Sequence, residues 1–194
     1  MNTIDYLSDL ESRVTSDWRH LSVQRTASGV RCVGHVPQVG DLAWLHRFYP
    51  GISAAELDWS ERRMSRPIPP AWREVLEAMS GLTLFIGDVS LSGLLSGGLM
   101  RRNPEDPGPF SIESDNGARV RYGPLVARDD FVIGGSAAGQ GGLYVLHLDQ
   151  SVSKTDVQAT TLLARWSSVP EMLDAEYGTF AALYDRDGNY HPRP

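Results

Sequence analysis

The sequence predicts an α+β fold in which several helices pack against a central, mostly antiparallel β-sheet. Three observations support this prediction. Helical periodicity dominates residues 4–79, short strand-like runs occupy much of residues 82–166, and an amphipathic helix closes the chain. Elements that are grouped in this way favour an antiparallel sheet over the alternating β–α units of a parallel one.

The size of the chain suits one globular unit. Its 194 residues are 41% hydrophobic and 22% charged, and a chain of this length buries roughly 70% of its unfolded surface. We divide it into an N-terminal helix and hairpin extension, residues 1–36, and a main domain, residues 37–194. Cys32 is the single cysteine, so the chain has neither a disulfide framework nor a thiolate metal site.

The charge pattern narrows the class of partner. The formal net charge is -6, which disfavours direct binding to nucleic acid because such binding depends on clustered Lys and Arg. The N-terminal stretch MNTIDYLSDLESRV carries acids where a secretory signal needs a basic region and an apolar core. No apolar run reaches the length of a membrane span. We therefore expect a cytoplasmic protein with a protein partner and no membrane association.

Periodicity and turn residues define the first elements. Residues 4–20 carry apolar side chains at three- and four-residue steps, which predicts a helix capped by Thr3. The turn-rich TASG between LSVQR and VRCVGHV predicts a short hairpin. A short helix is then expected to begin at Asp41 and end at Pro50, with an apolar face made of Leu42, Leu45 and Phe48.

Two helices with clearer signals follow. Ser53 and Glu56 form a capping box, so a helix is predicted over residues 54–65. Pro70 stands in the first turn of the next helix, where its missing N–H costs nothing. The apolar face of that helix consists of Trp72, Val75, Leu76 and Met79. Gly81 is expected to supply a left-handed C-terminal cap, with the strand LTLFI directly after it.

The remaining chain is mainly strands. RRNPEDPGP is a loop, and Asn116-Gly117 between FSIES and ARVRY predicts a hairpin turn. Further strands are expected at FVIGG, GLYVLHLD and VQATTLLARW, whereas residues 88–98 stay unassigned. Ser168 and Glu171 form a second capping box, for a helix that continues to about residue 184, and the tail after it is expected to fray.

The motifs of catalytic chemistry are incomplete in this sequence. The glycine-rich GGSAAGQGG lacks the Lys and the Ser or Thr of a phosphate-binding loop, and a strand rather than a helix follows it. His147 and Asp149 are expected on one face of a strand, which could orient an imidazole or hold a metal but is more often a solvent face. We expect a protein that is not an enzyme and that has no catalytic residue, metal site or cofactor.

One segment resembles the signature of a known family. Glu61 lies on a predicted helix and is followed by Ile68-Pro69, by Trp72, by Val75-Leu76, and by Ser80-Gly81 at the start of a strand. This order is similar to that of the SUKH superfamily, also called Smi/Knr-like, in which Asn is usual in place of the serine. The run FVIGGSAAGQGGLYVLHLD and the Ser-led closing helix resemble later parts of the same family.

The resemblance implies a mixed fold with helices against an antiparallel sheet, and a non-catalytic binding domain. Bacterial members are often immunity proteins that neutralise nuclease toxins, and yeast relatives act as interaction hubs in cell-wall regulation. We therefore expect an immunity protein for a basic, nuclease-type toxin, which an acidic surface would attract. The alternative is a regulatory interaction module with a non-toxin protein partner.

The candidate partner-binding residues combine acidic groups with aromatic anchors. They lie in or beside the long loop and at the end of a predicted strand: Glu105, Asp106, Phe110 and Asp149. Three tryptophans are further candidate anchors, namely Trp44, Trp59 and Trp166.

Overall fold

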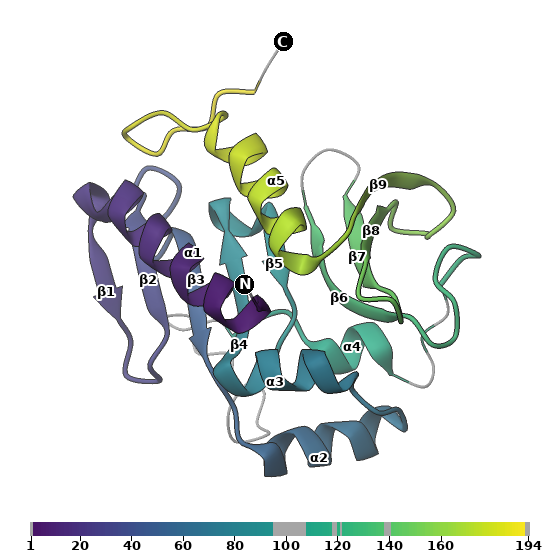
Figure 1. The fold of residues 1–194 in the computed structure, drawn as a ribbon. Coiled ribbons are helices and arrows are strands. Elements are labelled where there is room, and N and C mark those ends of the chain that lie inside the picture. The colour runs from purple at the N-terminus through teal and green to yellow at the C-terminus, as the bar shows by residue number, and fades with distance from the viewer. Residues whose placement is uncertain (1, 95–107, 118–119, 121, 138–140, 193–194) are drawn as a thin grey trace.

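A computed structural model of the chain describes residues 2–94, 108–117, 120, 122–137 and 141–192 (Figure 1). Within these residues nine strands form one antiparallel sheet, and their order in the sheet equals their order in the chain, so β1 and β9 are its edges. The strands are β1 Val23–Arg25, β2 Arg31–His35, β3 Trp44–Pro50, β4 Met79–Leu84, β5 Val89–Leu91, β6 Phe131–Ser136, β7 Gly142–Leu146, β8 Val152–Thr155 and β9 Leu162–Trp166.

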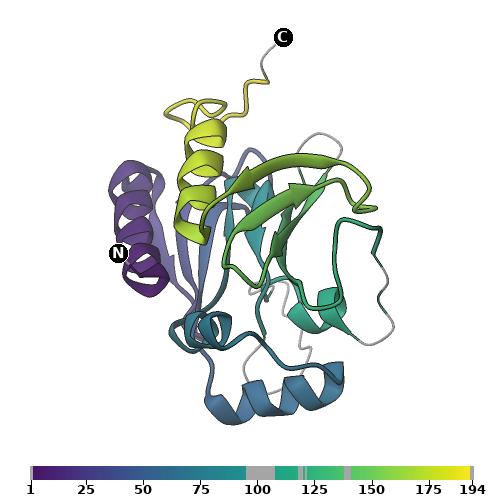
Figure 2. The same cartoon turned by 45° about the vertical axis from the view of Figure 1, so that its right-hand side comes forward.

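Five α-helices accompany the sheet in the described part of the chain. They are α1 Thr3–Trp18, α2 Ala54–Met64, α3 Pro70–Ala78, α4 Ile112–Asn116 and α5 Val169–Ala181. Helices α1 and α5 lie side by side across one face of the sheet, with α3 and α2 near one end of it (Figures 1 and 2). The predicted α+β class, with helices against an antiparallel sheet, is confirmed.

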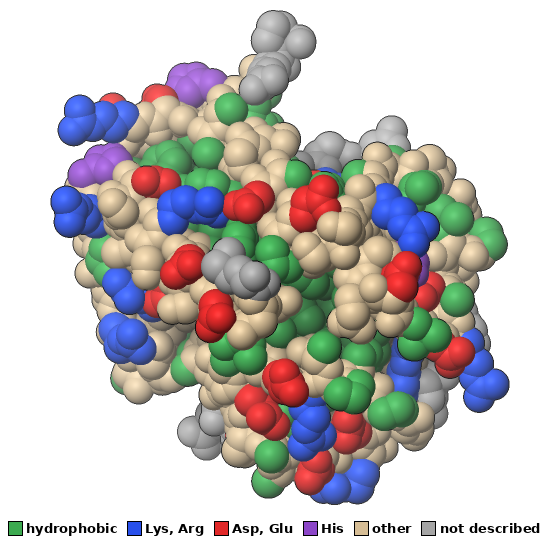
Figure 3. All heavy atoms as spheres, in the orientation of Figure 1, with side chains coloured by type: hydrophobic (Ala, Val, Ile, Leu, Met, Phe, Trp, Pro, Cys, Tyr) green, Lys and Arg blue, Asp and Glu red, His purple; other side chains and the backbone are tan. Residues whose placement is uncertain are grey.

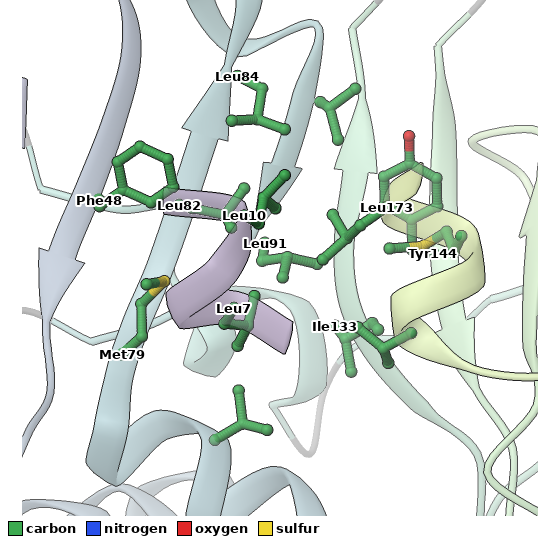
Figure 4. Packing of buried hydrophobic residues seen from close by; sticks show 14 of the residues in the cluster. Leu7, Leu10, Phe48, Met79, Leu82, Leu84, Leu91, Ile133, Tyr144 and Leu173 are labelled. Carbon is green, nitrogen blue, oxygen red and sulfur yellow. The ribbon is translucent and has the colours of Figure 1, made fainter. Parts of the chain in front are cut away.

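The main core lies between the helices and the covered face of the sheet. Figure 4 shows leucines of α1 and α5 gathered over apolar side chains of β4 to β7. At the far ends of the sequence, Tyr6 and Arg13 of α1 both bind the Asp174 carboxylate of α5, at 2.7 Å each. Residues 1–36 thus supply a helix and two strands to the same core and sheet as the rest of the chain.

The predicted helices with strong end signals are present. Ser53 caps α2, and its backbone N–H donates to Glu56 Oε2 at 2.9 Å, which completes the capping box. Helix α1 begins as expected, although the capping side chain is Asn2, whose Oδ1 accepts from the Asp5 N–H at 2.8 Å, and not Thr3. The TASG hairpin is also present as β1 and β2.

The helix predicted between Asp41 and Pro50 is wrong, because this segment forms strand β3. Strand β3 pairs with β2 on one side and β4 on the other. Phe48 packs into the main core, whereas Trp44 and Tyr49 belong to a second small cluster. Because aromatic residues buried on both faces of a central strand favour β-structure, packing overrides the helical spacing of the leucines.

The hairpin predicted around Asn116-Gly117 is also wrong, since residues 112–116 form helix α4. The Asn116 side chain does not serve a turn. Its Nδ2 donates to the Val132 carbonyl at 2.7 Å, and its Oδ1 accepts from the Val132 N–H at 2.9 Å. Asn116 therefore occupies both backbone groups of one β6 residue, as a neighbouring strand would.

Gly81 is not a helix cap. Helix α3 ends at Ala78, and strand β4 begins at once with Met79. Gly81 lies inside β4 with a φ of +91°, and a β-carbon there would stand 2.6 Å from the Leu91 carbonyl oxygen of β5. The glycine is needed for the close approach of two strands and not for the end of a helix.

Several boundaries and two strands were not predicted. Strand β5 lies in the unassigned stretch, and β8 had no prediction. Strands β1 to β3 precede α2, so strands and helices are interleaved in the first half of the chain. Helix α5 ends at Ala181, and the described tail is held by a bridge between Tyr184 and Tyr190 and by N–H groups that donate to the Asp185 carboxylate.

His46 of β3 creates a pH dependence of stability. It is fully buried beside Trp18 and Phe85, and neither ring nitrogen has a hydrogen-bond partner among the described residues. Burial lowers the pKa of His46 from 6.5 to about 3. Between these two values the unfolded state binds the extra proton, so the free energy of unfolding falls as the pH drops, by up to about 1.4 kcal/mol per pH unit.

We predict that His46→Phe removes most of this acid sensitivity, because phenylalanine keeps the aromatic packing and cannot bind a proton. Guanidinium denaturation at a series of pH values between 7 and 4 measures the effect. His20→Gln, at an exposed position after α1, is the control and is expected to keep the slope of the original chain. Equal slopes in His46→Phe and the unmodified protein would contradict the prediction.

Candidate functional site

The residues of the family-like motif lie at the junction of α2 and α3. Glu61 accepts from the Ile68 N–H at 2.8 Å and from Arg73 Nη1 at 3.1 Å, so one carboxylate joins α2, the connecting segment and α3. Pro69 is the N-cap residue of α3. Trp72 and Leu76 are buried in the main core. Glu61 thus links the two helices, while Trp72 and Leu76 attach α3 to the core.

The predicted partner-binding residues do not form one group. Glu105 and Asp106 lie outside the described residues. Phe110 is 55% exposed, and its carbonyl accepts from the Gly93 N–H just after β5. Asp149 is exposed in the turn between β7 and β8 and forms an ion pair with Arg165 of β9 at 3.6 Å. Phe110 and Asp149 thus lie at different parts of the sheet, beside the end of β5 and beside β9.

The three tryptophans differ in their surroundings. Trp44 is buried in the small cluster, so it cannot serve as a surface anchor without rearrangement. Trp59 is partly exposed on α2, with the Arg63 guanidinium 4.4 Å from the centre of its ring. Trp166 is half-buried against Tyr144.

His147 has different partners from those predicted. Strand β7 ends at Leu146, so His147 begins the turn and does not share a strand face with Asp149. Its Nδ1 lies 2.9 Å from Asp130 Oδ1, and its Nε2 lies 2.8 Å from Ser153 Oγ. No local signal predicts this arrangement, because Asp130 precedes β6 and Ser153 lies on β8.

Ser153, His147 and Asp130 are hydrogen-bonded in series, as are the nucleophile, the base and the orienting acid of a catalytic triad. Its setting differs from that of a working nucleophile. Ser153 is 3% exposed, and it pairs with Val145 of β7 on one side and with Arg165 of β9 on the other. A substrate has no approach to Oγ unless the surrounding chain moves. The same bonds join the segment before β6, the turn after β7 and strand β8, which is a structural cross-link.

A second polar network lies beneath α5. Lys154 Nζ contacts both carboxylate oxygens of Glu176, at 3.0 and 3.1 Å, and the Tyr144 hydroxyl donates to Glu176 Oε2 at 2.7 Å. Burial and the Glu176 charge raise the pKa of Tyr144, so its hydroxyl stays protonated. The network joins β7 and β8 to α5. In the described residues no group of three His, Cys, Asp or Glu side chains is placed to hold a metal ion.

Four exposed apolar side chains lie on β9 or in the turns beside it. Leu162 and Leu163 of β9 are 54% and 51% exposed, and Leu148 and Val157 are exposed in the flanking turns. We call these four residues, with Asp149, Asp156 and Glu171, the β9 surface. Figure 3 shows hydrophobic side chains scattered among charged ones on this side of the molecule. Exposed apolar side chains bordered by polar groups are typical of protein-binding surfaces.

The three carboxylates of the β9 surface are held in their charged form. Hydrogen bonds from Ser151 lower the pKa of Asp149, bonds from Thr160 lower that of Asp156, and bonds from Ser167 lower that of Glu171. Thr160 and Ser167 lie within two residues of the ends of β9, and Ser151 directly precedes β8. The ends of β9 therefore carry negative charge at neutral pH.

Comparison with known proteins adds no relative, because no protein-family model matches the chain and a search of curated proteins finds no match. Among the described residues, no helix combines the length and apolar character needed to cross a membrane.

The Lys154–Glu176 pair gives a prediction on stability. Lys154→Met leaves the Glu176 charge buried without its cation, which we expect to lower the free energy of unfolding by about 3–5 kcal/mol. The double variant Lys154→Met, Glu176→Leu is expected to recover part of the loss, because it removes the buried charge but leaves the Tyr144 hydroxyl without its acceptor. Arg13→Met, in the exposed pair with Asp174, is the control and should cost about 1 kcal/mol or less. Urea denaturation measures all three variants, and equal losses for Lys154→Met and Arg13→Met would contradict the prediction.

The structural interpretation of Ser153 is tested separately. Ser153→Ala removes one partner of His147 and is expected to lower stability by about 1–2 kcal/mol, whereas Ser16→Ala, on the exposed side of α1, should change it by about 0.5 kcal/mol or less. A fluorophosphonate probe should not label Ser153 in the folded protein. Stoichiometric labelling that Ser153→Ala abolishes would show instead that the hydroxyl is an activated nucleophile.

Proposed function

We propose that the protein is a non-catalytic protein-binding domain, and that it acts in the cytoplasm as an immunity protein against a cognate nuclease-type toxin of bacteria. The observation that carries the proposal is the β9 surface, where two adjacent leucines are exposed on an edge strand between charged carboxylates. Burial of such leucines in a complex stabilises it by about 25 cal/mol for each Å² of apolar surface removed from water.

The toxin-binding role rests on two further points. The segment from Glu61 to Gly81 resembles the signature of the SUKH superfamily. Immunity proteins are common in that superfamily. The net charge of -6 and the three carboxylates of the β9 surface favour a basic partner, and complementary charge speeds association.

A regulatory module with a non-toxin partner is the second candidate. One observation favours it: Arg165 of β9 stands between the carboxylates and pairs with Asp149, so the surface also suits a partner without strong positive charge. A gene of ordinary metabolism beside this one in the native genome would favour this candidate.

Coexpression tests the proposal. The product of the adjacent open reading frame is expressed with and without this protein, and growth is measured. We expect growth to be restored by the unmodified chain and by Val23→Asp at the other sheet edge, but not by the double variant Leu162→Asp, Leu163→Asp. In a binding assay the double variant should lose at least about 30-fold in affinity, as expected for central contacts. Equal toxicity in all cultures, or full rescue by the double variant, would count against it.

A further inference from the structure

The two edges of the sheet differ in how well they are protected. Strand β1 has three residues, and it ends in Gln24 and Arg25, polar side chains that discourage pairing with another strand. Strand β9 has five residues, and it begins with two leucines that are more than half exposed. An edge strand that exposes apolar side chains can act as a template for a further strand, and among the described residues only Arg165 of β9 and the register shift opposite Thr155 oppose this.

The inner side of β9 pairs with β8, with a register shift beside Leu163, and the outer side has no partner strand among the described residues. Thr155, Lys154 and Val152 of β8 face Leu162, Ala164 and Trp166 of β9. Figure 2 shows β9 as the outermost strand, with α5 continuing from its end. Alternate N–H and C=O groups of such an edge point away from the sheet and can bind another extended chain.

The charges around β9 indicate which kind of extended segment would bind there. Asp156 precedes β9, while Asp149 and Glu171 adjoin its C-terminal end through Arg165 and Ser167. In an antiparallel pair of two β9 strands, the Asp156 end of each copy would meet the Asp149 and Glu171 end of the other. Repulsion between these carboxylates disfavours a second copy of this chain and favours a segment with basic ends.

We propose that β9 accepts an extended segment of the partner protein as an additional antiparallel strand, and that this segment has alternating apolar residues between Lys or Arg at its two ends. The inference rests on the proposed protein-binding function and names the binding mode. Main-chain hydrogen bonds supply affinity, Leu162 and Leu163 cover the apolar side chains, and the carboxylates at both ends fix the register.

Synthetic peptides test the binding mode with the protein unchanged. The first is a short peptide of alternating Val and Thr with paired Arg at each end. The second has paired Asp in place of Arg, and the third is the Arg peptide with every Val and Thr N-methylated, which has no main-chain N–H left to donate between the arginines. Amide hydrogen exchange of the protein, followed by NMR, reports where each peptide binds.

We expect the Arg peptide to slow exchange of β9 amides, the Asp peptide to bind at least about ten-fold more weakly, and the N-methylated peptide to give no protection. Equal binding of the Arg and Asp peptides, protection that survives N-methylation, or no protection of β9 would overturn the inference. Protection of β9 that grows with protein concentration in the absence of peptide would show that a second copy occupies the edge, which overturns it too.

The outcome is separable from that of the proposed function. If the coexpressed neighbour is neutralised but its complex leaves β9 amides exchanging freely, strand addition is refuted and the binding function stands. If neutralisation fails while the Arg peptide protects β9, the edge binds extended chains and the toxin-directed function is wrong.

Discussion

The centre of the sheet depends on contacts between backbones that leave no room for a β-carbon. A β-carbon at Gly93 would clash with the Ser80 carbonyl, and one at Gly134 would clash with the Ser90 carbonyl. Gly93 follows β5, and Gly134 of β6 pairs with Leu91 of β5, the three-residue strand that links the β1–β4 half of the sheet to the β6–β9 half. The continuity of the whole sheet therefore rests on a few glycines around its shortest central strand.

Local signals in the sequence were sufficient for some elements. The Ser53–Glu56 capping box and Pro70 located α2 and α3, because these signals act within one helical turn. Distant partners decided the elements that were missed. Asn116 is typical of a turn, yet its amide binds Val132 of β6, and β3 became a strand because both of its faces are covered. No residue near Asn116 or β3 in the sequence indicates these distant contacts.

The candidate site shows the same division. Asp149 was predicted as a binding residue and does lie at the β9 surface, but the exposed leucines of β9 were not singled out, because exposure depends on strand order. The hydrogen bonds from His147 to Asp130 and Ser153 could not be predicted from the sequence either. Both polar networks tie separate segments of the β6–β9 half together, which gives β9 a firm support for contact with a partner.

The contacts between α1 and α5 also bear on the synthesis of the chain. Tyr6 and Arg13 bind Asp174, and the Trp18 indole donates to the Tyr177 hydroxyl at 3.2 Å, so α1 is held by α5, which is synthesised much later. The β-meander between them can form hairpin by hairpin as it emerges, since each strand pairs with the one before it. The docking of helix α1 therefore cannot be complete until α5 has been synthesised.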